Sequence, residues 1–136
     1  MKRIFLISCS RKKLAQAVKA RSLYDSPLFH KSLAYAESEN PDMIFVLSAK
    51  HGLLALDTEI EPYDLTLNNM RVTEIEAWAT AVLAQLRGKA NLEHDQFIFL
   101  AGDRYRRFLA PFLTHKSVPM QGLAIGRQLQ FLGNRK

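Results

Sequence analysis

Cysteine is nearly absent from this chain of 136 residues, which has only Cys9. A single cysteine excludes an internal disulfide and a zinc site built from cysteines. Such usage is most simply explained by a cytosolic protein. Long apolar runs are also lacking, and none approaches the ~20 residues that a membrane span needs. The four histidines are scattered without the spacing of metal ligands. We therefore expect no metal, no cofactor and no membrane partner.

Several nucleotide-binding motifs are missing as well. There is no Walker motif, and the glycines of Gly122–Gly126 have the wrong spacing for a dinucleotide fingerprint. Nothing matches a DNA-reading helix-turn-helix or an RNA-binding sheet signature. The start, Met1–Ile7, resembles a signal peptide faintly, but its apolar part is short and Arg11-Lys12-Lys13 follows without a cleavage site. We interpret it as a first strand.

Basic residues outnumber acidic ones by 19 to 13, which gives a formal net charge of +6. Such a balance favours polyanions, because it steers them electrostatically and releases their counterions on binding. The alternative is an ordinary basic surface that binds nothing specific. We expect a nucleic acid or a nucleotide as partner, and the charge leaves the oligomeric state open.

Three short apolar runs predict buried parallel strands, because each is continuous and bounded by polar or turn residues. A fourth short strand is expected around Ser117-Val118. The three runs are Ile4–Ser8, Met43–Leu47 and Phe97–Leu100.

Four helical patterns lie between and after these runs. The clearest spans Val72–Arg87, where apolar residues recur every three or four positions and Thr73 with Glu76 resembles a capping box. A second begins at Ser26-Pro27 and ends before Asn40-Pro41. A third helix is expected to begin near Asp103, and Pro111 limits its length or kinks it. Its inward residues would be Tyr105, Phe108, Leu109 and Phe112. The fourth is expected to run from Gln121 or Gly122 to Leu132.

This alternation predicts one α/β domain over residues 1–136, a three-layer α/β/α sandwich with a short, mostly parallel central sheet. The segment Leu54–Asn69 has no clear period. It is long for a plain connection, and long loops in compact domains are often functional.

In open α/β sheets, ligands bind outside the carboxyl ends of the strands. Each predicted strand is followed by a turn that combines small residues with charged or nucleophilic ones. If the strands are parallel neighbours, these turns converge on one site. The turns are Ser8–Lys13, Ser48–Leu53 and Ala101–Tyr105, and they contribute Ser10, Ser48, Gly102 and Arg104 as substrate-binding candidates.

Within the first turn, Cys9 is a candidate nucleophile, activated by Lys12, Lys50 or His51. The alternative is a small residue buried at a strand end, as free cysteines commonly are. Ser10 either binds a ligand or caps the following turn.

The second turn contains Lys50-His51-Gly52, which is the sharper motif. His51 is a candidate acid or base near neutral pH, and Lys50 a candidate phosphate ligand. The alternative is a turn whose glycine takes a positive φ while His51 is merely hydrogen-bonded.

The loop that follows is acidic, with Asp57 and Asp64 as candidates to activate water or hold a ribose hydroxyl. The alternative is that this segment is an acidic loop exposed to solvent, with no role in a site. Tyr24, Tyr63 and Tyr105 either stack on a base or are boundary tyrosines whose hydroxyl faces water.

Motifs across nearly the whole chain together resemble a family of small bacterial and phage proteins that is largely of uncharacterised function. That family is distantly similar to the catalytic core of archaeosine synthase, with some likeness to the peroxide-stress DNA-binding family and, in fold, to uracil-DNA glycosylases. Cys9, Ser10, Lys13, Tyr24 and Ser26 match the synthase's first motif, although an insertion follows Lys13. The motifs are Cys9-Ser10-x-x-Lys13, Ala20-x-x-Leu23-Tyr24-x-Ser26-x-x-Phe29, Leu47–Leu53, Pro62-Tyr63-Asp64-x-x-Leu67, Leu100-Ala101-Gly102-x-x-Tyr105 and Gly122-Leu123-x-Ile125-Gly126.

This resemblance implies a pocket for a base or nucleotide at the strand ends. We expect an enzyme that acts on a nucleobase or nucleoside, in DNA or RNA, by glycosidic-bond hydrolysis or base transfer. Asp64 or Asp57 would position water or the sugar, and His51 would supply an acid. Two alternatives stay open: a nucleic-acid-binding protein without catalysis, in stress response or phage defence, and a nucleotide sensor. The residues expected to hold phosphate or line the floor are Cys9, Ser10, Lys13, Lys50 and Arg104.

Overall fold

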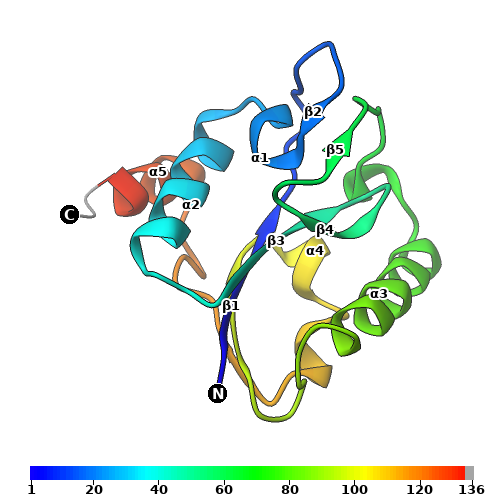
Figure 1. Cartoon of the computed structure of the whole chain (residues 1–136), viewed down its shortest axis with the longest axis vertical. Helices are drawn as coiled ribbons and strands as arrows, with labels where there is room; N and C mark the ends of the chain where they lie inside the picture. The colour runs from blue at the N-terminus through cyan, green and yellow to red at the C-terminus, as the bar shows by residue number, and fades with distance from the viewer. Residues whose placement is uncertain (134–136) are drawn as a thin grey trace.

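A computed structural model describes residues 1–133 of the chain (Figure 1), and within them five strands form a central sheet in the order β4-β3-β1-β6-β7. Neighbouring strands are parallel except for the β3–β4 pair, which is antiparallel. Each of the three predicted strands is present and is one residue longer than its apolar run. The strands are β1 (Arg3–Ser8), β3 (Met43–Ser48), β4 (Gly52–Ala55), β6 (Gln96–Leu100) and β7 (His115–Ser117).

Side chains of the central strands alternate between two hydrophobic cores, one on each face of the sheet. In β1, Ile4 and Leu6 belong to one core, and Phe5 and Ile7 belong to the other. Successive side chains of a strand point to opposite faces, so a strand buried on both faces must be apolar at every position. This is why the central strands are continuous apolar runs in the sequence.

Helices cover both faces of the sheet, as Figure 1 shows. α3 (Val72–Arg87) packs with α4 (Asp103–Arg106) over the face of Ile4 and Leu6. α2 (Pro27–Ser38) and α5 (Ile125–Gly133) cover the opposite face, and the short α1 (Ala20–Leu23) precedes α2. The predicted α/β/α sandwich with a mostly parallel sheet is confirmed.

The two longest helices have the predicted bounds, but one of them has a different cap. Ser26 caps α2, since its hydroxyl accepts a hydrogen bond from the backbone N–H of Phe29 at 3.1 Å. α3 is capped by Glu74, whose carboxylate accepts from the backbone N–H of Arg71 at 2.9 Å. The prediction of a capping box at Thr73 and Glu76 is therefore wrong, because the helix begins two residues earlier than that box requires.

Two later helices are shorter than predicted. α4 ends at Arg106, and a 3₁₀ turn, η2 (Ala110–Phe112), takes over around Pro111. Phe112, which was expected to face inward, is 57% exposed because η2 turns it away from the core. α5 begins at Ile125, after a turn in which Gly122 has a φ of +83°.

The segment without a clear period contains short elements that its pattern did not indicate. It includes the second half of β4, then β5 (Glu59–Ile60), and later a 3₁₀ turn, η1 (Leu67–Asn69). β5 pairs with β2 (Val18–Lys19) in a separate two-stranded sheet beside the carboxyl ends of the main strands. Strands of two to four residues are too short to show a period of two.

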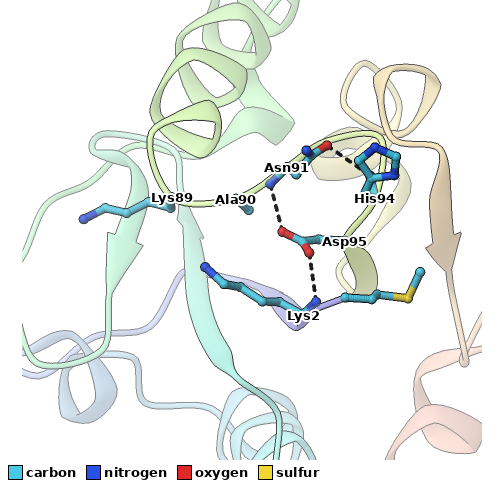
Figure 2. Close-up of a pocket in the computed structure, with 7 residues that line it drawn as sticks. Lys2, Lys89, Ala90, Asn91, His94 and Asp95 are labelled. Atoms are coloured by element: carbon cyan, nitrogen blue, oxygen red, sulfur yellow. Dashed lines mark hydrogen bonds between the residues drawn. The ribbon is translucent and has the colours of Figure 1, made fainter.

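At the amino end of the sheet, one carboxylate joins β1 to the loop before β6. Asp95, only 7% exposed, accepts hydrogen bonds from the backbone N–H groups of Lys2 and Asn91, both at 2.8 Å (Figure 2). The bond from Asn91, followed by that from Lys2, lowers the pKa of Asp95. A hollow of about 680 Å³ opens beside it. Both carboxylate oxygens bind backbone, so Asp95 has a structural role.

Replacing Asp95 by Asn should lower the free energy of unfolding at pH 7 by about 1–3 kcal/mol, because one backbone N–H loses its acceptor. The pKa of Asp95 is lower in the folded than in the unfolded chain. Its contribution is therefore fully present above about pH 4 and is lost as the pH falls through the folded value. Urea unfolding at pH 7 and at pH 3 should show the difference between the two proteins shrinking in acid. A difference that does not change with pH would contradict this role.

Candidate functional site

The carboxyl ends of β1 and β6 open into a cleft of about 480 Å³. The chain leaves β1 for the helices of one face and leaves β6 for α4 on the other face. The cleft therefore lies where the two connections diverge, which is the position where open α/β sheets bind ligands. Its lining comprises Ser8, Cys9, Leu28, Asn68, Gly102, Asp103, Arg104, Tyr105, Arg107 and Gln128.

Cys9 and Tyr105 meet in this cleft, with the sulfur and the phenol oxygen 3.4 Å apart. The ring of Tyr105 is only 8% exposed and packs edge-to-face on Trp78, with centroids 5.7 Å apart. Burial raises the pKa of Tyr105, so the phenol is protonated at neutral pH. Tyr105 thus offers a hydrogen-bond donor to Cys9, and not a ring face for a stacked base.

A chain of three hydroxyls, Ser48, Tyr63 and Tyr24, runs beside Cys9; we call it the hydroxyl chain. The oxygen of Tyr63 lies 2.8 Å from that of Ser48 and 2.7 Å from that of Tyr24. The fully buried Ser48 hydroxyl also accepts from the backbone N–H groups of Lys50 and His51, at 3.3 and 3.0 Å. A serine oxygen has two lone pairs and one proton, so Ser48 must donate its proton to Tyr63.

Burial raises the pKa of both tyrosines, that of Tyr24 to about 12. Both phenols are therefore neutral hydrogen-bonding groups at physiological pH. Tyr24 is fully buried and offers no ring face for stacking. Tyr63 is half-buried, and its ring contacts two other candidates, Lys13 and His51.

The ammonium group of Lys13 lies 4.3 Å from the ring centre of Tyr63 and 5.8 Å from that of Tyr24. An antiparallel bridge between Lys13 and Tyr24 and a hydrogen bond to the carbonyl of Arg11 at 3.0 Å hold it there. Burial lowers the pKa of Lys13, and electrostatic interactions with Cys9 and Asp64 oppose that shift in part. The ring faces of Tyr63 and Tyr24 also favour the protonated ammonium group. Lys13 is therefore a cation held beside Cys9 whose protonation is easily changed.

His51 lies against the edge of the Tyr63 ring, with centroids 5.6 Å apart. Burial, then the charge of Lys50, lowers the pKa of His51. The neutral imidazole therefore dominates at pH 7, and this form suits a base better than an acid. His51 lines a second hollow of about 490 Å³ beside β4, separate from the lining of the cleft.

The turn that carries Lys50 and His51 is the hairpin between β3 and β4. Gly52 has a φ of +72°, and a Cβ there would lie 2.3 Å from the side-chain oxygen of Gln85. That oxygen accepts from the backbone N–H of Leu53 at 2.9 Å. The glycine is thus required by backbone geometry, which was the alternative interpretation of this motif. The side chain of Lys50 points to solvent.

The side chains of three predicted site residues form no hydrogen bond with the hydroxyl chain or with the pair of Cys9 and Tyr105. The carboxylate of Asp57 is 77% exposed and faces Arg21 at 3.5 Å. The hydroxyl of Ser10 donates to the carbonyl of Lys12 at 2.8 Å and closes a local turn. Asp64 is exposed and acts on the site through its charge on Lys13.

Three residues of the site escaped the sequence analysis. Trp78, one of the apolar residues of α3, donates its indole N–H to the carbonyl of Ser48 at 2.9 Å. Asn68 and Gln128 line the cleft from η1 and α5. No spacing links these elements to the strand ends, so only the tertiary fold could reveal them.

Among residues 1–133, no three histidine, cysteine or acidic side chains are grouped as they would be around a metal ion. No helix in that part of the chain is long and apolar enough to cross a membrane.

The lowered pKa of Lys13 gives a direct prediction. Because burial favours the neutral amine, Lys13 should reach half-maximal acylation at a lower pH than lysine in a short unstructured peptide. Limited acetylation with acetic anhydride over a pH series, followed by peptide mass spectrometry, measures this. Urea-unfolded protein is the control and should show the peptide value. Labelling of the folded protein at the peptide's pH or above would contradict the environment described for this amine.

Comparison with known proteins places the chain in a family, but that family has no known activity. No curated protein and no solved structure matches the chain. A model described as a family of unknown function, DUF6884, matches residues 4–134. Since this match covers nearly the whole chain, the protein belongs to the DUF6884 family.

Proposed function

We propose that the protein binds a nucleobase-containing ligand in the cleft and acts on its base by glycosidic-bond hydrolysis or base transfer. The observation that carries this proposal is the position of the cleft at the divergence of the β1 and β6 connections, where Cys9 and Tyr105 meet. Its volume, about 480 Å³, lies in the range of small-molecule sites. The resemblance of the first motif to a base-modifying synthase supports the same class of substrate.

Two amide side chains in the cleft suit the edge of a base. The amide nitrogen of Gln128 donates to the carbonyl of Leu123 at 2.9 Å, so its oxygen is left as an acceptor. The side chain of Asn68 has no hydrogen-bond partner within residues 1–133 and retains both donor and acceptor. A base presents N–H donors and ring or carbonyl acceptors along one edge, which matches this pair.

Arg104 suits a phosphate at the mouth of the cleft. It is exposed and lines the cleft, and no acidic side chain of residues 1–133 pairs with it. Its neighbour Arg107 is occupied, since its guanidinium binds Asp103. A guanidinium that is not already neutralised is well suited to bind phosphate oxygens.

The reacting groups are best assigned around Lys13 and Cys9. Asp64, which faces Lys13, is the carboxylate that positions water or the sugar. Cys9 forms the floor of the cleft. His51 lines the separate hollow beside β4 and is given no role in the cleft. Asp57 is left out, because its carboxylate is directed to Arg21 on the surface.

A nucleic-acid-binding protein without catalysis is the second candidate, and the loop after β1 favours it. Arg11 and Lys12 are exposed on this loop, and Lys12 pairs only loosely with Asp25 at 3.9 Å. Such a loop beside the cleft could track a phosphate backbone. Stabilisation by DNA or RNA only, lost at high salt and unaffected by cleft variants, would favour this candidate.

Blocking the cleft tests the proposed site. Gly102 has a φ of −70° and a ψ of 169°, and a Cβ added there meets no atom within 4 Å, so Gly102→Leu should fold normally. Gly126→Leu is the matched control, since its Cβ is equally unobstructed and Gly126 lies outside the cleft lining.

The measurement is a thermal-shift screen of bases, 7-deazaguanines, nucleosides, nucleotides and short DNA and RNA. A hit should be followed by titration of the fluorescence of Trp78, the single tryptophan. We expect Gly102→Leu to weaken binding by about tenfold or more, as an obstructed pocket does, and Gly126→Leu to leave it unchanged. Equal affinity in both variants would place the ligand elsewhere.

Replacing Arg104 by Ala tests the phosphate position. Wild type should bind a nucleoside 5′-monophosphate about tenfold more tightly than the nucleoside, the size expected for one charge-assisted contact. Arg104→Ala should remove that preference and leave nucleoside affinity unchanged. Arg127→Ala removes an exposed arginine outside the cleft and serves as control. A preference retained in Arg104→Ala would exclude this residue as the phosphate ligand.

A further inference from the structure

Cys9 occupies a distinctive position in the fold. It follows the last residue of the central strand, its backbone N–H bonds to the carbonyl of Leu47 at 3.1 Å, and its side chain packs against both hydrophobic cores while lining the cleft. It is also the single cysteine of the chain. Any chemistry on a thiol of this protein therefore reports on the floor of the cleft.

The phenol of Tyr105 is the hydrogen-bonding group in contact with this sulfur. The side-chain hydroxyl of Thr66 and the backbone N–H of Leu67 lie on the side of the phenol oxygen of Tyr105 and favour its ionised form, which lowers its pKa against the larger effect of burial. Thr66 itself accepts from the backbone N–H of Asn68 at 3.2 Å, which leaves its proton for Tyr105. Because these donors face the phenol oxygen and burial keeps the phenol protonated, its own proton is available to Cys9, 3.4 Å away.

We propose that Tyr105 is a positioning residue, which donates a hydrogen bond to the sulfur of Cys9 and thereby holds that sulfur facing the cleft. This inference rests on the proposed function only in taking Cys9 as a group that faces the substrate. A hydrogen bond to a charged acceptor is stronger than one to a neutral acceptor, so the donor favours the ionised sulfur.

Four titratable groups face Cys9, and they come from different parts of the chain: Lys13, Tyr24, Tyr63 and Tyr105. Lys13 is the cation among them, and Asp64 faces Lys13 in turn. The phenols of Tyr24 and Tyr63 are engaged with each other in the hydroxyl chain. Tyr105 is therefore the phenol whose proton is available to the sulfur.

The ring of Tyr105 has a separate structural role that the test must preserve. It packs on Trp78 and belongs to the core beneath α3. Tyr105→Phe keeps this ring and removes only the hydroxyl. Thr66→Val is a second variant, which removes one of the two donors that orient the phenol and leaves Tyr105 itself in place.

The experiment is alkylation of Cys9 by iodoacetamide, in which a carbon–sulfur bond forms, iodide leaves and the thiol proton passes to buffer. Rates are measured over a pH series by mass spectrometry, with the melting temperature recorded for every variant. Tyr35→Phe is the control, because its phenol lies on α2 among Phe5 and Phe131.

Tyr105→Phe should move the pH profile of alkylation to higher pH by about one unit, the equivalent of one hydrogen bond to a charged group. Thr66→Val should move it less, in the same direction, and Tyr35→Phe should leave it in place. A Tyr105→Phe profile that superimposes on that of wild type, or moves to lower pH, would overturn the proposal. If Tyr105→Phe does not fold, an unmoved Thr66→Val profile would overturn it.

Alkylation needs no ligand, so this result is independent of the proposed function. A moved profile in a protein that binds no nucleotide would leave the role of Tyr105 intact and refute the substrate class. An unmoved profile in a protein that binds nucleotides in the cleft would do the reverse.

Discussion

The site depends on the buried residue Ser48, at the end of β3. Its hydroxyl fixes the turn of Lys50 and His51 and donates to Tyr63. Its carbonyl accepts the indole N–H of Trp78, whose ring supports Tyr105. Ser48 thus connects two parts of the site. The hydroxyl chain supports Lys13, and the pair of Trp78 and Tyr105 lies beside Cys9.

Desolvation explains why this arrangement is so fully hydrogen-bonded. A buried polar group without a partner costs stability, and no buried side-chain nitrogen or oxygen within residues 1–133 lacks one. The same burial raises the pKa of the tyrosines and lowers those of Lys13 and His51. Burial therefore favours neutral groups around Cys9, where Lys13 is the interacting cation. The charged residues Asp103, Arg104 and Arg107 line the mouth of the cleft.

The sequence predicted the strands best where both faces of the sheet are buried. β1, β3 and β6 were predictable because both of their faces are covered, and the convergence of their turns followed from parallel topology. The motif at Lys50-His51-Gly52 was noticed, but its hairpin was not, because β4 has only four residues. Trp78 and Gln128 reach the site from helices distant in sequence, and no local pattern records such contacts. Asp57 lies between His51 and Tyr63 in the sequence, but its carboxylate faces Arg21 on the surface.

The account is tested most directly by a double-mutant cycle between Ser48→Ala and Tyr63→Phe, with the free energy of unfolding measured in urea. If the hydroxyl chain organises the site, the two losses share one hydrogen bond and should couple by about 1 kcal/mol or more. The ring of Tyr35 packs on Phe5 and Phe131. The pair Ser48→Ala and Tyr35→Phe should therefore add within about 0.5 kcal/mol. Additive losses for Ser48 and Tyr63 would contradict the central role given to this hydroxyl.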